Sequence, residues 1–100
     1  MNINIENANG VTTAYLDGRL DTPASTEVTP SFEQLKEAAG GTVLLDCTNL
    51  SYISSSGLRL FLALRKEAGA KGGKVIVRNI SDNIRQVFMM TGFLNMFEIQ

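Results

Sequence analysis

The sequence of 100 residues contains no histidine, no tryptophan and only one cysteine. Without histidine the chain cannot form a Ser-His-Asp or Cys-His catalytic set, or the usual histidine-ligated zinc site. One cysteine cannot make an internal disulfide or a four-cysteine metal site. An enzyme would have to use carboxylates, lysine, tyrosine or hydroxyls. We therefore expect a binding or signalling protein with no catalytic residues, no metal and no cofactor.

The first half of the chain has few basic side chains, and the second half has few acidic ones. Residues 1–50 carry seven acidic and two basic side chains, whereas residues 51–100 carry three acidic and seven basic ones. The basic side chains are scattered over several predicted elements and are not interleaved with aromatic residues. A nucleic-acid surface is normally denser and richer in aromatics, so we expect no direct nucleic-acid binding.

Long apolar runs are also missing. The longest one, residues 58–64, contains Arg59 and is far shorter than the roughly 20 residues of a membrane-spanning helix. The first six residues lack the basic and apolar segments of a signal peptide, and no lipidation motif is present. The sequence predicts a cytoplasmic protein without membrane insertion.

The first half of the chain predicts a hairpin followed by a helix. Ile3 and Ile5 alternate with polar residues as in a half-buried strand, and residues 9–10 (Asn-Gly) favour a tight turn before a second strand at residues 11–16. Thr22 is expected to cap a helix that has Pro23 in its first turn. Pro30 predicts either a kink in this helix or a restart capped by Thr29.

The rest of the chain alternates short apolar strands with helices. Strands are predicted at residues 42–47 and 74–78, and helices at about residues 57–68 and from Ser81 to Gly92. Residues 94–99 are expected to form a short strand or helix. This order predicts a single α/β domain over residues 1–100, with one mixed sheet that is opened by an antiparallel hairpin and has helices packed on it.

A soft apolar cluster lies near the end of the chain. It contains Met89, Met90, Phe93, Met96 and Phe97. Such side chains are more often core than interface, although methionine-rich surfaces can also form adaptable binding patches.

Three consecutive serines, Ser54, Ser55 and Ser56, stand where a loop is expected to turn into a helix, directly before Gly57. At a helix start the free N–H groups and the helix dipole favour negative charge. A phosphate on one of these hydroxyls would add roughly −1.5 to −2 charges at that point. The segment therefore predicts a phosphorylation switch, although serines are also common as simple helix caps.

The run from Asp46 to Leu58, the Gly-Arg-Leu-Asp turn at residues 18–21 and the order of elements resemble the STAS domain family of bacterial anti-sigma factor antagonists. The resemblance implies an anti-sigma factor antagonist that regulates transcription. In that family a serine at a helix start is phosphorylated by the anti-sigma factor, which is also a serine kinase, and a serine phosphatase reverses the modification. The unphosphorylated protein binds the kinase.

Matched position by position, the resemblance makes Ser55 the phosphorylation site, with Ser54 and Ser56 as weaker candidates. Ser54 stands where the family motif has aspartate, which is a departure from the pattern. Asp46 is expected to have a structural role and to cap a loop. The expected partner-binding residues lie around the serines and in the turn after the second strand: Asp21, Ser54, Ser55, Ser56, Gly57 and Arg59.

Two other hypotheses remain open from the sequence. The absent aspartate at position 54 favours a STAS adaptor subunit without phosphorylation, as in a lipid or anion transport complex. The third hypothesis is an enzyme using Asp17, Asp21 and Asp46, but no phosphate loop or metal motif supports it.

Overall fold

The chain begins with the antiparallel hairpin that its sequence predicts. In the computed structural model, which describes residues 1–100, strands β1 (Asn2–Ala8) and β2 (Val11–Leu20) pair around a turn at Asn9 and Gly10. Both turn residues have positive φ angles, 55° and 80°, as tight hairpin turns require. The Asn-Gly pair supplies them at low conformational cost.

Three further strands extend the hairpin into one five-stranded sheet of order β1-β2-β3-β4-β5. They are β3 (Thr42–Ile53), β4 (Lys74–Arg78) and β5 (Glu98–Ile99). Strands β2 to β5 are parallel to one another, and β1 is antiparallel to β2. The predicted mixed α/β sheet opened by a hairpin is confirmed.

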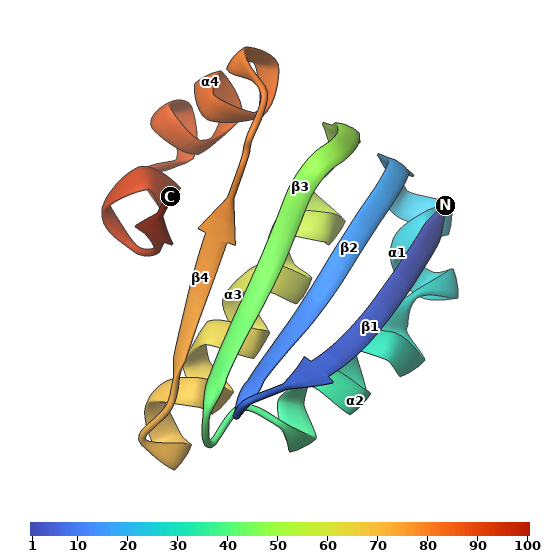
Figure 1. The fold of residues 1–100 in the computed structure, drawn as a ribbon. Helices are drawn as coiled ribbons and strands as arrows, with labels where there is room; N and C mark the ends of the chain where they lie inside the picture. The colour runs from blue at the N-terminus through green and yellow to red at the C-terminus, as the bar shows by residue number, and fades with distance from the viewer.

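The helices cover one face of this sheet. They are α1 (Thr22–Glu27), α2 (Thr29–Glu37), α3 (Ser55–Lys71), α4 (Asp82–Thr91) and the short 3-10 helix η1 (Phe93–Asn95). Figure 1 shows α1, α2 and α3 behind the sheet, while α4 lies beyond the end of β4. The opposite face of the sheet is therefore free of helices.

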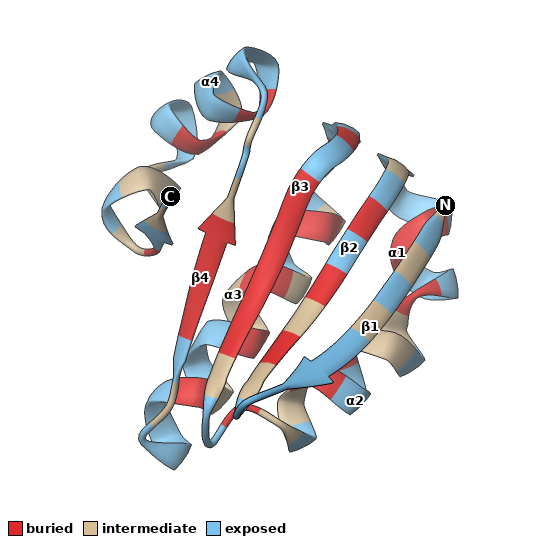
Figure 2. Cartoon of the chain, viewed as in Figure 1, coloured by how far each residue is buried: buried red, intermediate tan, exposed pale blue.

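The main core lies between the sheet and its helices. It contains 22 buried residues, with Phe32, Phe61 and Phe88 fully enclosed. Five consecutive residues of β3, 43–47, are buried, so side chains on both faces of this strand are covered (Figure 2). Leu44 and Ile76 are buried but stand outside this cluster, and they pair in register across β3 and β4.

The start of the helical segment differs from the expectation. Asp21, not Thr22, caps α1, because its side chain accepts a hydrogen bond of 2.9 Å from the backbone N–H of Ala24. A new helix begins before Pro30, as one alternative predicted, but Val28 and not Thr29 is its N-cap. Its hydroxyl instead donates to the carbonyl of Ser25 at 2.7 Å.

Strand β3 is longer than predicted, and α3 begins earlier. The expected strand ended at residue 47, whereas β3 continues to Ile53. Residues 51–53 thus belong to the strand and not to a serine-rich loop. Helix α3 starts at Ser55 rather than Gly57, so the strand passes into the helix through Ser54 alone.

The C-terminal methionines divide between core and surface. Phe97 is buried, and Phe93 and Met96 pack against the core, as expected. Met89 and Met90 are 63% and 87% exposed, so the more common core position does not hold for these two, and they are surface residues as the alternative allowed. They follow the buried Phe88 on the outer side of α4. No helix of the protein is long and apolar enough to cross a membrane.

Candidate functional site

The serine segment and the turn after β2 meet at one edge of the sheet. Because β2 and β3 are parallel, their carboxyl ends lie side by side, with Leu20 paired to Ile53. The backbone N–H of Ser54 donates to the carbonyl of Leu20 at 2.9 Å. Asp21 follows Leu20 directly in the chain, so this hydrogen bond brings Asp21 and Ser54 close together. Both are predicted partner-binding residues.

Ser54 is the N-cap of α3. Its backbone is extended, and its hydroxyl accepts a hydrogen bond of 3.2 Å from the N–H of Gly57. Its carbonyl accepts the first helical hydrogen bond, 2.9 Å from the N–H of Leu58. Serine and aspartate are both strong N-caps. Replacing the family's aspartate by Ser54 therefore preserves the cap while removing one negative charge.

Ser55 and Arg59 lie on the accessible surface of α3. Ser55 is the first residue of the helix and is exposed, Ser56 is half-buried, and Arg59 is exposed. The hydroxyl of Ser55 is not the one that caps the helix. Of the three serines, Ser55 thus combines the greatest exposure with a side chain free of the capping role.

Gly57 brings the start of α3 against the two strand ends. A Cβ atom on Gly57 would lie 2.7 Å from Cγ of Leu20 and 2.9 Å from Cγ1 of Ile53. Both distances are shorter than ordinary contact, so only glycine fits without movement of its neighbours. Gly57 is itself buried. Its close packing fixes how Ser55 is presented at the surface.

An exposed cation–π pair flanks the serines. The guanidinium of Arg19 lies over the ring of Tyr52, 4.4 Å from the ring centre, and these residues pair in register across β2 and β3. The sequence does not predict this pair, because Ser51 and Tyr52 are typical of a loop. If β2 and β3 are known to pair as far as Leu20 and Ile53, the register places Arg19 beside Tyr52.

Asp46 has the structural role that was expected, but it lies within β3 and does not cap a loop, and it also forms an ion pair that was not expected. One carboxylate oxygen accepts hydrogen bonds from the backbone N–H of Thr48 at 2.9 Å and from the Thr48 hydroxyl at 2.7 Å. The other lies 2.7 Å from a guanidinium nitrogen of Arg78. Burial raises the pKa of Asp46, but the hydrogen bonds of Thr48 and Arg78 and the charge of Arg78 outweigh it and lower the pKa.

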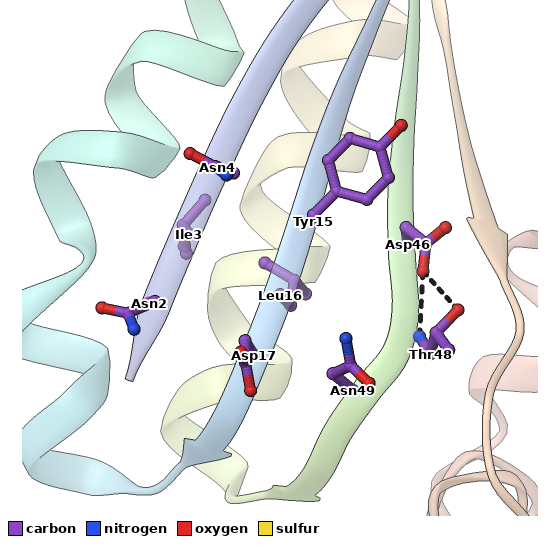
Figure 3. A pocket seen from close by; sticks show the side chains of 9 residues that line it. All are labelled: Asn2, Ile3, Asn4, Tyr15, Leu16, Asp17, Asp46, Thr48 and Asn49. Atoms are coloured by element: carbon purple, nitrogen blue, oxygen red, sulfur yellow. Dashed lines mark hydrogen bonds between the residues drawn. The ribbon is translucent and has the colours of Figure 1, made fainter.

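A hollow of about 670 Å³ opens on the helix-free face of the sheet (Figure 3), and none of the three serines lines it. Its lining is mainly polar and comes from β1, β2 and β3: Asn2, Ile3, Asn4, Tyr15, Leu16, Asp17, Asp46, Thr48 and Asn49. The carboxylates of the enzyme hypothesis do not act as one set here. Asp17 and Asp46 share the hollow, but both oxygens of Asp46 are engaged, and Asp21 caps α1.

The single cysteine is part of the core. Cys47 is fully buried in β3, and burial together with the nearby Asp46 raises the pKa of its thiol to about 12. A thiol with such a pKa is almost entirely protonated at neutral pH and is a poor nucleophile or metal ligand.

Comparison with known proteins gives a family match over nearly the whole chain. The sequence pattern of the STAS domain matches residues 2–100. A curated relative is BtrV of Bordetella bronchiseptica, named as an anti-sigma factor antagonist. It is 26% identical over 99 residues, which cover 99% of this chain and 85% of the relative.

Solved structures share the fold. The phosphorylated form of the Bacillus cell fate determinant SpoIIAA is 25% identical with a TM-score of 0.74, and the match covers 99% of this chain and 91% of SpoIIAA. A sulfate transporter family protein from Wolinella succinogenes is 13% identical with a TM-score of 0.76, covering 92% of this chain and 77% of that protein. The second likeness concerns the fold alone.

Proposed function

Because the chain belongs to the STAS domain family, we propose that it is an anti-sigma factor antagonist controlled by phosphorylation of Ser55. Unphosphorylated, it binds an anti-sigma factor that is also a serine kinase, and phosphorylation releases that partner. A serine phosphatase resets the switch. The protein acts by binding and not as an enzyme, in the cytoplasm where transcription takes place.

The observation that carries this proposal is the exposed Ser55 hydroxyl at the start of α3, one residue after the cap. In the modification, the Oγ atom of Ser55 forms a bond to the γ-phosphorus of ATP as the bond to the ADP oxygen breaks, and the hydroxyl proton is lost. Ser54 is the poorer acceptor because its hydroxyl caps the helix. Ser56 is poorer because it is half-buried.

The sequence around Ser55 makes one added phosphate a large local change. No acidic residue occurs between Asp46 and Glu67. A phosphate of roughly −1.5 to −2 charges would stand in an interface formed for an uncharged hydroxyl, where repulsion or the loss of hydration opposes binding. Of the other predicted partner contacts, Asp21 caps α1 and Arg59 is exposed on α3 itself, whereas Gly57 is buried.

The first prediction concerns the charge at position 55. Ser55→Asp should weaken binding to the purified cognate anti-sigma factor at least tenfold, about 1.4 kcal/mol, because a carboxylate mimics part of the phosphate charge. Ser55→Ala should bind within about threefold of the wild type, since it adds no charge. Titration calorimetry of the three proteins measures this difference.

The matched control is Gln34→Glu, which adds the same single charge at an exposed position of α2, a different helix from the one that carries Ser55. It should leave the affinity unchanged. If Ser55→Asp and Ser55→Ala bind with equal affinity, the proposed switch is wrong.

A second candidate function is the transport adaptor without phosphorylation. The observation that favours it is Ser54 in place of the family's aspartate. Affinity capture from native extract separates the two candidates. A stoichiometric complex with a transporter subunit, and no complex with a soluble serine kinase, would favour the adaptor.

A further inference from the structure

Ser55 and Arg59 are neighbours on one exposed face of α3. They are four residues apart, and such pairs on a helix surface have Cβ atoms about 5–6 Å apart. Helical side chains also lean toward the N-terminus of their helix. A side chain as long as that of Arg59 can therefore reach a group attached to Ser55.

The charge of Arg59 has no partner in the unmodified protein. Five ion pairs occur in the structure, and none of them includes Arg59. The other cation near the serines, Arg19, is stacked on Tyr52. No carboxylate in residues 47–66 competes for Arg59. The guanidinium of Arg59 is thus a cation without an ion-pair partner, and it lies near the end of α3 that carries the serines.

We propose that Arg59 binds the phosphate of phosphorylated Ser55 and is thereby withdrawn from the partner surface, an inference that rests on the proposed function. A guanidinium matches a phosphate in geometry, since it can donate two parallel hydrogen bonds to two phosphate oxygens. The N–H of Gly57 cannot play this part while it is bonded to the Ser54 hydroxyl. Phosphorylation would then change the surface twice, by adding an anion and by removing an available cation.

The test uses the full-length protein with phosphoserine incorporated at position 55 during translation, so no kinase is needed. ³¹P NMR followed over pH measures the second ionisation of the phosphate. A guanidinium nearby favours the dianion, so the pKa should be lower with Arg59 present. The ionisation constant should be about twofold larger than in Arg59→Ala, with an intermediate value for Arg59→Lys. About 1 M salt should remove the difference.

Lys66→Ala is the matched control, because it removes one exposed positive charge from the same helix. Lys66 is eleven residues from Ser55, which is about 16 Å along the helix. This distance is about twice the Debye length at physiological salt, so the charge of Lys66 should hardly affect a phosphate on Ser55. Its variant should titrate like the wild type. Equal ionisation constants for the wild type and Arg59→Ala would overturn the inference while leaving the switch itself intact. A kinase that ignores Ser55 would overturn the switch without affecting this result.

Discussion

Gly73→Ala should destabilise the protein by about 3 kcal/mol or more, or prevent it from folding. Gly73 lies between α3 and β4, where a Cβ atom would overlap the carbonyl oxygens of Ala39 and Gly41. Both are backbone atoms, so no side-chain rotation relieves the clash. The Gly41 carbonyl also accepts the N–H of Lys74 at 3.0 Å. Chemical denaturation followed by circular dichroism measures the loss.

Gly69→Ala is the matched control for this substitution. Gly69 is an exposed residue within α3, and its Cβ would meet no atom within 4 Å. Alanine favours the helix over glycine by up to about 1 kcal/mol, so this variant should be slightly more stable than the wild type. A Gly73→Ala protein as stable as the wild type would contradict the described packing of the α2–β3 turn against the α3–β4 turn.

Asp46→Ala should cost about 2–3 kcal/mol of stability at neutral pH. It removes the acceptor of two Thr48 hydrogen bonds and the partner of Arg78. We place the loss below that of a fully buried pair because the Arg78 side chain is 35% exposed. Asp17→Ala removes an exposed carboxylate that has no ion pair, and it should change stability by less than about 0.5 kcal/mol.

The effect of Asp46 should depend on pH in a defined direction. The folded state lowers the pKa of Asp46 below its ordinary value of 3.8. Its charged form therefore stabilises the fold at pH values above 3.8, and this contribution disappears as the pH falls through the lower, folded-state pKa. The difference in unfolding free energy between the wild type and Asp46→Asn should shrink below about pH 4. A difference that stays constant down to pH 2 would contradict the ion pair.

Local patterns were sufficient to predict much of this fold. The Asn9-Gly10 turn, the alternation of Ile3 and Ile5 and the apolar strands each reflect short-range chemistry, and the structure contains all of them. The serine segment was also recognised as a helix start, because hydroxyl caps have a local signature. The relation between Ser55 and the turn at Asp21 follows from the parallel pairing of β2 and β3.

The features that the sequence did not reveal depend on contacts between distant residues. Asp46 and Arg78 are 32 positions apart and meet only because β3 and β4 pair in register. The full length of β3 was missed because Ser51 and Tyr52 look like loop residues, whereas β2 supplies them with partners. The sequence left open whether Met89 and Met90 are core or surface residues, and α4 buries Ile84 and Phe88 while it exposes both methionines.

The most direct test of the account is to incubate the protein with ATP and its cognate anti-sigma kinase and to locate the phosphate by mass spectrometry. We expect one phosphate per chain, on Ser55, and none on the Ser55→Ala variant. We also expect that the modified protein no longer forms a complex with the kinase. A phosphate on Ser54 or Ser56 instead, or no phosphate from a kinase that binds the protein, would contradict the account.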